Sequence, residues 1–217
     1  LTLLVAFPFG ILVAGPFGNW MAEWLHRGIM ALCGFSPVLM GVLIGGLWQV
    51  LGSVGIHGII TVLAFADVLA GNSSPLLALS YSASFAVSGV AFAVFMRSRN
   101  SGEKQTAKAG AVSAIMGATE PAMYALIKPD KKRFALCCAG GALGGATAGF
   151  FGISMHAYAG MGITGLFGFF QTGDVKLVGV LLMAVLPFGF TWLIEMLLYR
   201  QEKAVESEEI IVMPVNG

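Results

Sequence analysis

The first 96 residues contain only three formally charged side chains, those of Glu23, Arg27 and Asp67. Over the whole chain 11% of the residues are charged and 57% are hydrophobic, whereas a soluble domain carries about 25% charged residues. Because so few ionic groups cannot cover a surface that faces water, the chain is predicted to be an integral membrane protein surrounded by a lipid bilayer. The apolar content excludes intrinsic disorder, and the net charge of +1 argues against a nucleic-acid partner.

The apolar stretches can be compared with the ~20 residues that a membrane-spanning helix needs. Residues 57–71 are short for a span, and residues 3–19 are interrupted by prolines and glycines. Pro37 is expected to kink or to start the helix that contains it. The expected spans are residues 29–51, 76–96, 134–153 and 175–199.

Glycine accounts for 30 residues, and Gly141, Gly145 and Gly149 follow one another at four-residue spacing. This spacing places the three glycines on one face of the predicted helix 134–153, where a second helix can approach closely. We therefore assign this face to packing rather than to chemistry.

Residues 107–127 are apolar, but Gly117, Glu120 and Pro121 interrupt their centre. Each arm is then about half as long as a membrane crossing requires. A broken backbone at membrane depth is tolerated only where it is enclosed by protein or lines a watery cavity. The stretch is therefore predicted to be a re-entrant hairpin with a cavity at its break, and the glycine-rich residues 154–173 are expected to form a second re-entrant element.

Basic residues flank the predicted hairpin on both sides. They are Arg97, Arg99, Lys104 and Lys108 before it, and Lys128, Lys131, Lys132 and Arg133 after it. Because basic residues concentrate in cytoplasmic loops, both ends of the hairpin are expected on the cytoplasmic side, and two further crossings bring the C-terminus there as well. The fold class that follows is an all-α integral membrane protein, a multi-span helical bundle with one or two re-entrant hairpins.

Glu120 is the strongest candidate for chemistry. Pro121 removes a backbone donor and directs Glu120 away from helical geometry, and a carboxylate buried at membrane depth is costly unless it serves a ligand or a partner. Glu120 either accepts hydrogen bonds from a ligand or caps the broken helix. His57, among the glycines that follow residues 48–51, is either a ligand-binding residue or a core histidine.

The remaining polar groups are given structural roles. Asp67 is expected to cap residues 71–75 or to lie at an interface, His156 is interpreted as a core residue, and Glu195 is expected to pair with Arg200 or to reach the membrane edge. Buried free thiols without metal-ligand spacing are expected at Cys33, Cys137 and Cys138. No metal site or cofactor is predicted.

Two motifs resemble a known family. Residues 117–124, GATEPAMY, resemble the GITEPAIY signature of the membrane component, enzyme IIC, of bacterial sugar phosphotransferase systems. Residues 45–51, GGLWQVL, followed by Gly55-Ile56-His57, are similar to the GGxWQxL…GxH stretch of the same family. The order and spacing of the two blocks fit the glucose/β-glucoside branch, and the resemblance extends over about residues 35–199.

The resemblance implies the transport half of an enzyme IIC fold. Such a subunit binds a β-glucoside-type sugar and presents it to a IIB domain for phosphorylation during uptake across the bacterial inner membrane. The activity would be that of a protein-Nπ-phosphohistidine–sugar phosphotransferase. The implied partners are the sugar, IIB and IIA domains that carry the phosphoryl group on cysteine and histidine, the phosphocarrier protein and a second copy in a homodimer. None of the three cysteines stands in the Cys-x-x-Arg pattern of a IIB domain.

By the same resemblance Glu120 is the catalytic residue and a substrate ligand, and His57, Thr119 and Gln49 bind substrate. Gly58 stands where an aromatic residue is usual, and Ala125 where glycine is usual. These departures leave open whether the sugar is a β-glucoside, sucrose or trehalose.

The chain begins inside an apolar run without a methionine, which indicates a cut within a larger protein. Residues 1–199 are assigned to a partial enzyme IIC domain, 200–209 to a charged cytoplasmic linker and 210–217 to the start of a IIA domain. The last segment, IIVMPVNG, is similar to the opening IxSPVxG strand of IIA domains, with Met213 in place of the serine. Two alternatives remain, namely an ion-coupled secondary transporter with similar broken helices and a membrane anchor for a fused cytoplasmic domain.

Overall fold

The computed structural model describes residues 2–170 and 176–199. In chain order the elements are α1 (Thr2–Phe9), the π-helix η1 (Gly10–Ala14), α2 (Gly15–Phe35), α3 (Pro37–Val54), α4 (His57–Leu69), α5 (Pro75–Tyr81), α6 (Ala83–Arg97), α7 (Ser101–Ile115), α8 (Glu120–Ala122), the π-helix η2 (Met123–Ile127), α9 (Lys131–Phe151), α10 (Gly162–Gly165), the 3-10 helix η3 (Leu166–Phe169) and α11 (Leu177–Leu198). The described residues form no strand, and the all-α fold class is confirmed.

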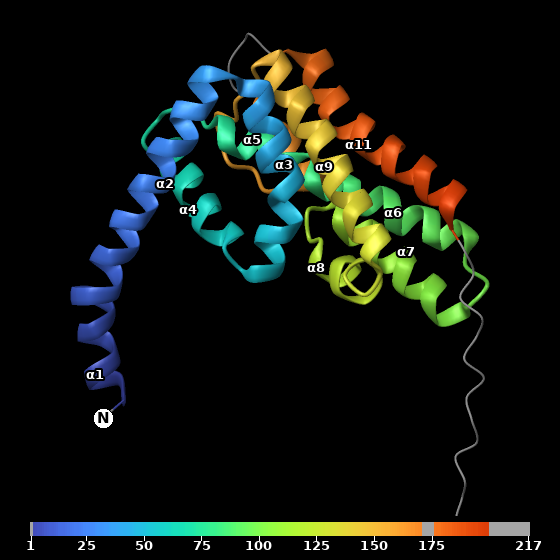
Figure 1. The fold of residues 1–217 in the computed structure, drawn as a ribbon, viewed down its shortest axis with the longest axis horizontal. Coiled ribbons are helices and arrows are strands. Elements are labelled where there is room, and N and C mark those ends of the chain that lie inside the picture. The colour runs from blue at the N-terminus through green and yellow to red at the C-terminus, as the bar shows by residue number, and fades with distance from the viewer. Residues whose placement is uncertain (1, 171–175, 200–217) are drawn as a thin grey trace, which may run out of the picture.

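Four helical segments are long and apolar enough to cross a membrane, namely α3, α5–α6, α9 and α11. The segment α5–α6 lies at the centre, because 94% of its apolar window is buried within the protein, and α7, α9 and α11 pack around it (Figure 1). The spans expected at 76–96, 134–153 and 175–199 are thus confirmed to within a few residues.

The span expected at 29–51 has the wrong limits, because the helix breaks at Ser36. Ser36 has an extended backbone, and its Oγ accepts a hydrogen bond from the Leu39 backbone N–H at 3.2 Å, which caps the new helix. Pro37 occupies the first turn, where no N–H needs a partner within the helix. Pro37 therefore starts α3, and residues 29–35 end α2.

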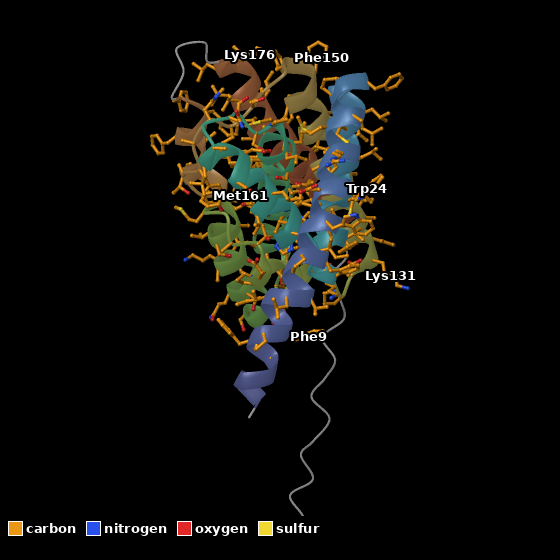
Figure 2. All side chains as sticks on the ribbon, turned by 90° about the vertical axis from the view of Figure 1, so that its left-hand side faces the viewer. Phe9, Trp24, Lys131, Phe150, Met161 and Lys176 are labelled. Atoms are coloured by element: carbon orange, nitrogen blue, oxygen red, sulfur yellow. The ribbon has the colours of Figure 1, made fainter. Side chains whose placement is uncertain are left out.

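Residues 3–19 were expected to be interrupted, but they belong to one helical arm that runs through α1, η1 and α2. The interruption takes the form of the π-helical turn η1. The arm extends away from the bundle (Figures 1 and 2). Aromatic side chains along it are exposed, with Phe9 60% and Trp24 62% exposed.

The glycine face of α9 packs directly on α3, as the four-residue spacing predicts. A Cβ atom at Gly145 would overlap the backbone of Gly41, and one at Gly141 would overlap the backbone of Gly45. The third glycine, Gly149, meets the start of α3 in the same way. Both helices thus contribute small residues to the contact, which is how membrane helices approach each other closely.

Gly145→Ala is expected to lower the free energy of unfolding by about 1–3 kcal/mol, because the new methyl group forces α3 and α9 apart. Thermal unfolding of the detergent-solubilised protein measures the effect. Gly189→Ala in α11 is the matched control, because a Cβ there meets no atom within 4 Å. Equal melting temperatures for the two variants would contradict the close contact.

The predicted hairpin is present, although its arms are unequal. The first arm is α7, which has 15 residues and begins at Ser101 rather than at residue 107. The second consists of α8 and η2, with 3 and 5 residues. The backbone turns at Gly117, whose φ of +102° is accessible mainly to glycine.

Residues 154–170 are irregular and partly buried, as expected of a second re-entrant element, and 171–173 lie outside the described residues. Met155 and Ser74 exchange two backbone hydrogen bonds, of 2.8 and 3.0 Å. Gly162 lies against the backbone of Gly117, so this segment touches the break of the hairpin.

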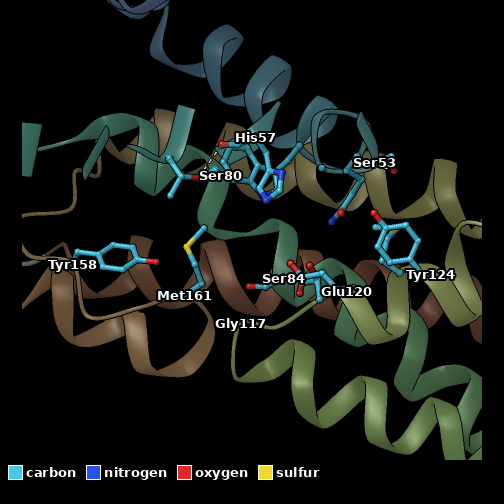
Figure 3. Close-up of a pocket in the computed structure, with 15 residues that line it drawn as sticks. Ser53, His57, Ser80, Ser84, Gly117, Glu120, Tyr124, Tyr158 and Met161 are labelled. Carbon is cyan, nitrogen blue, oxygen red and sulfur yellow. Dashed lines mark hydrogen bonds between the residues drawn. The ribbon is translucent and has the colours of Figure 1, made fainter. Parts of the chain in front are cut away.

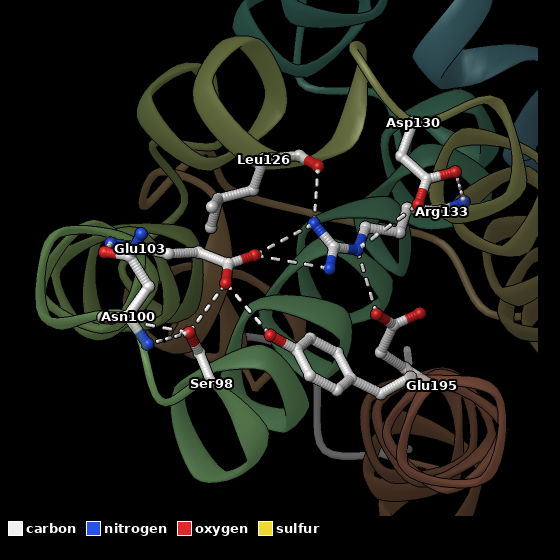
Figure 4. A network of polar contacts seen from close by, with 8 residues as sticks. Ser98, Asn100, Glu103, Leu126, Asp130, Arg133 and Glu195 are labelled. Carbon is white, nitrogen blue, oxygen red and sulfur yellow. Dashed lines mark hydrogen bonds and ion pairs between the residues drawn. The ribbon is translucent and has the colours of Figure 1, made fainter. Parts of the chain in front are cut away.

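A polar cluster joins one end of α7, α9 and α11 (Figure 4). Arg133 at the start of α9 donates to Glu195 of α11 at 2.9 Å and to Glu103 of α7 at 3.4 Å. Tyr199 donates to Glu103 at 2.9 Å. Both ends of the hairpin and the end of α11 therefore lie on the same side of the bundle, as a re-entrant geometry requires.

This cluster also identifies the partner of Glu195. The expected ion pair exists, but it is formed with Arg133, while Arg200 lies outside the described residues. Two free thiols are described, Cys137 buried as expected and Cys138 only half-buried, which corrects the expectation for the latter. The side chain of Cys33 lies outside the description.

Candidate functional site

A cavity of about 240 Å³ lies where α3, α4, α5–α6, the hairpin and the irregular segment 154–170 meet (Figure 3). Pockets for drug-sized ligands have volumes of ~300–1,000 Å³. The cavity is thus matched to a smaller molecule. Ser84, one of its lining residues, lies near the middle of the span Pro75–Arg97, which is the depth at which transporters bind their substrates.

The four residues predicted from the sequence all line this cavity. Gln49 comes from α3, His57 from the start of α4, and Thr119 and Glu120 from the break of the hairpin. Three separate segments of the chain thus place these side chains around a single space. Their individual roles in binding stay predictions.

Glu120 is placed by the turn that ends α7. The backbone N–H of Gly117 donates to Ala114 at 3.0 Å and that of Ala118 donates to Ser113 at 2.9 Å, after which Glu120 begins α8. The expectation that Glu120 is buried is wrong, because its side chain is exposed and open to the cavity. Within the described chain its carboxylate makes no hydrogen bond or ion pair, so it does not cap the broken helix and is available to a ligand.

His57 follows directly on the end of α3. Gly55 ends that helix in the left-handed conformation, with φ +86°, and α4 begins at His57. The half-buried ring packs edge-on against Trp48 at 5.8 Å and faces the cavity from the side opposite Glu120 (Figure 3). Its Nδ1 is buried without a hydrogen-bond partner in the described protein. A buried polar atom left unpaired costs about 1–3 kcal/mol, which favours a ligand-binding role over that of a core histidine.

The Gln49 side chain is 4% exposed, and its amide nitrogen donates to the backbone carbonyl of Ala83 at 3.1 Å. The amide oxygen and the second N–H of the amide then remain for a ligand. Because this oxygen and the Glu120 carboxylate are both acceptors, the polar groups of the cavity suit a molecule that brings hydroxyl donors.

Four hydroxyl side chains that the sequence reasoning missed add to this pattern. Each donates its proton to a backbone carbonyl three or four residues earlier in the chain, at 2.9–3.2 Å, and so keeps its oxygen lone pairs for a ligand. They are Ser53, Thr61, Ser80 and Ser84. A signal was present, because Ser53 follows Gln49, and Thr61 follows His57, by one helical turn.

Other polar candidates stand outside the cavity lining. His156 is half-buried, which corrects the expectation of a core residue, and its backbone N–H donates to the carbonyl of Gly168 at 3.1 Å. The backbone carbonyl of Asp67 accepts a hydrogen bond from Asn72 at 3.0 Å, beside the turn that this residue was expected to cap. Neither residue lines the cavity.

Comparison with known proteins supports a family assignment. The family model described as "Phosphotransferase system, EIIC" matches residues 1–139, which include all four predicted site residues. The chain is 32% identical over 173 residues to a β-glucoside-specific EIIBCA component of Halalkalibacterium halodurans, covering 80% of this chain and 27% of the relative. It is 28% identical over 210 residues to the arbutin-, cellobiose- and salicin-specific EIIBC component of Escherichia coli, covering 95% and 43%.

A sucrose-specific EIIBC component of Bacillus subtilis is 25% identical over 216 residues, covering 99% of this chain and 43% of the relative. The chain therefore spans less than half the length of these curated relatives. No solved structure matches it significantly. With nearly two thirds of its residues matched by the family model, and with the signature residues gathered at one cavity, the chain belongs to the EIIC family of the phosphotransferase system.

Proposed function

We propose that this chain is the sugar-translocating part of a phosphotransferase-system permease and holds the glucosyl ring of a β-glucoside between His57 and Glu120. One observation carries the proposal: residues from three separate segments, matched by the family signature, converge on a small cavity rich in hydrogen-bond acceptors. A sugar presents several hydroxyl donors to such a lining. The choice of a β-glucoside follows the names of the relatives from Halalkalibacterium halodurans and Escherichia coli described above.

In the proposed mechanism the Glu120 carboxylate accepts hydrogen bonds from the sugar and acts as a general base for one hydroxyl. The oxygen of that hydroxyl attacks the phosphoryl group carried by the cysteine of a IIB domain. A new O–P bond forms, the S–P bond breaks, and the hydroxyl proton passes to Glu120. His57, Thr119 and Gln49 orient the sugar ring, so that the reacting hydroxyl is held next to Glu120 before the reaction begins.

The proposal extends to partners and location. The relatives are named EIIBC and EIIBCA components, which supports IIB and IIA domains as the source of the phosphoryl group, supplied in turn by the phosphocarrier protein. A homodimer in the bacterial inner membrane is part of the same proposal. The basic ends of the hairpin and the end of α11 would then face the cytoplasm, where those domains work.

Membrane vesicles test the function. With phosphoenolpyruvate, the general carrier proteins and the IIB and IIA domains, they are expected to accumulate methyl β-glucoside as its phosphate. Accumulation of the unmodified sugar in response to a proton gradient alone would instead show a secondary transporter. If vesicles without this chain phosphorylated the sugar at the same rate, the chain would be only a membrane anchor.

The re-entrant hairpin predicts which residues are accessible from each side of the membrane. Lys104→Cys, at an exposed position in the first turn of the hairpin, and Lys131→Cys, at an exposed position just after it, are both expected to react with an impermeant maleimide from the cytoplasmic side. Lys176→Cys, at the opposite end of α9 and α11, is the matched control and is expected to react from outside. Labelling of Lys104→Cys and Lys131→Cys from opposite sides would mean that the segment between them crosses the membrane.

A further inference from the structure

Glu120 has no neighbouring side chain that holds its carboxylate in one direction. Within the described chain this carboxylate makes no hydrogen bond or ion pair. In many catalytic sites the base is oriented by a third group. Here the position of the base must follow from the backbone that carries it, so the contacts around residues 117–120 decide where the carboxylate lies.

One side of this backbone is fixed within the hairpin. The short helix α8 packs so closely on α7 that a Cβ atom at Gly110 would overlap the side chain of Ala122. The Met123 backbone N–H donates to the carbonyl of Thr119 at 2.8 Å, which closes the turn at the start of α8. The second arm is thus held against the first, and the turn 117–119 needs a contact from outside the hairpin to fix it.

The irregular segment between α9 and α10 supplies that contact. Gly117 and Gly162 have φ values of +102° and +66°, which are accessible mainly to glycine, and their backbones meet directly. A Cβ atom at Gly117 would overlap the backbone of Met161, which lies beside it in Figure 3. The same segment brings Tyr158 and Met161 to the cavity lining. A shift of this segment is therefore passed on to the turn that precedes Glu120.

The buried hydroxyl of Tyr81 holds the segment in place. It donates a hydrogen bond to the carbonyl of Gly162, 81 residues further along the chain. Tyr81 is 0% exposed, and its ring packs between Phe85 and Phe169 at centroid distances of 5.5 and 5.2 Å. Tyr81 is not among the residues that line the cavity. Its hydroxyl thus fixes the segment on which the break of the hairpin rests, without facing the ligand.

We infer that Tyr81 is a positioning residue for Glu120, acting through the backbones of Gly162 and Gly117 and not through contact with the sugar. This inference rests on the proposed function and adds to it the group that orients its general base. A misplacement of ~1 Å can lower a catalysed rate about 100-fold. Loss of one buried hydrogen bond in this series of contacts therefore slows the reaction although every reacting group is still present.

Tyr81→Phe tests the inference, because it keeps the aromatic ring and removes only the hydroxyl. It is expected to lower the rate of phosphoenolpyruvate-dependent phosphorylation of methyl β-glucoside about tenfold. In a Glu120→Gln background the same substitution should change the rate by less than about twofold, because no base remains to be misplaced. Gly162→Ala, whose new Cβ displaces the same backbone directly, is a second variant with the same expected pattern.

Thr191→Val is the matched control. It removes a buried hydroxyl that donates to the carbonyl of Ala86 at 2.9 Å, outside the cavity lining. We expect it to lower the melting temperature about as much as Tyr81→Phe does but to leave the phosphorylation rate unchanged, with all rates measured below the melting temperature of each variant.

Two results would overturn the positioning role while phosphorylation by the unaltered protein still upheld the proposed function. One is an unchanged rate in Tyr81→Phe. The other is the same loss of rate with and without Glu120→Gln, since a general loosening of the fold would slow both proteins alike. Failure of the unaltered protein to phosphorylate the sugar would overturn both proposals.

Discussion

Glu120→Gln is expected to lower the rate of sugar phosphorylation at least about 100-fold, the usual contribution of a positioned general base. Glutamine keeps the size of the side chain but removes the negative charge and the ability to take the proton. It also presents N–H donors to sugar hydroxyls where the carboxylate presents only acceptors. Because the carboxylate has no structural partner in the described chain, the substitution should leave the fold unchanged.

Phosphoenolpyruvate-dependent phosphorylation of methyl β-glucoside, with thermal unfolding measured in parallel, checks this expectation. Glu23→Gln is the matched control, since Glu23 lies on α2 with an exposed side chain paired to Arg27. An unchanged phosphorylation rate in Glu120→Gln would remove Glu120 from the mechanism. A lower melting temperature in that variant alone would assign it a structural role.

Arg133→Met is expected to destabilise the protein by about 3–5 kcal/mol, the usual result of removing one partner from a buried ion pair. The Arg133 and Glu195 side chains are only 11% and 7% exposed, and the substitution leaves the Glu195 carboxylate without its cation. Glu103 loses its contact with the same guanidinium. Thermal unfolding in detergent measures the effect, and Lys132→Met, at an exposed neighbouring position, is the control.

The double variant Arg133→Met with Glu195→Gln separates loss of the ion pair from loss of packing. It is expected to be more stable than Arg133→Met alone, because it no longer buries an unpaired carboxylate. Strictly additive effects of the two substitutions would contradict a direct interaction. Since this cluster ties the ends of the hairpin to α11, its loss should also weaken sugar binding by loosening the hairpin that carries Glu120.

The sequence was sufficient for those features that depend on local composition. The apolar stretches predicted four spans, three of which the structure confirms, and the coincidence of Gly117 and Pro121 with a carboxylate predicted the broken hairpin. The start of α3 was missed, because hydropathy continues unchanged through Ser36 and only the capping geometry marks the boundary. The arm formed by α1 and α2 was missed for a related reason, since a π-helical turn absorbs the interruption without ending the helix.

Features that depend on distant contacts could not be predicted in the same way. Arg133 and Glu195 are 62 residues apart in the chain, so a neighbour such as Arg200 was the natural expectation for the ion pair. The exposure of Glu120 depends on how three segments surround the cavity. A local sequence pattern does not predict that arrangement. Tyr158 stood in a segment identified only as irregular, and its place at the cavity follows from the contact between Gly162 and Gly117.

The most direct test of the central claim is an experimental structure of the protein with methyl β-glucoside bound. We expect the glucosyl ring in the cavity between α4 and the hairpin, with hydroxyl groups within hydrogen-bond distance of both Glu120 and His57. A sugar bound elsewhere, or an empty cavity at a sugar concentration that saturates transport, would contradict the assignment of this site.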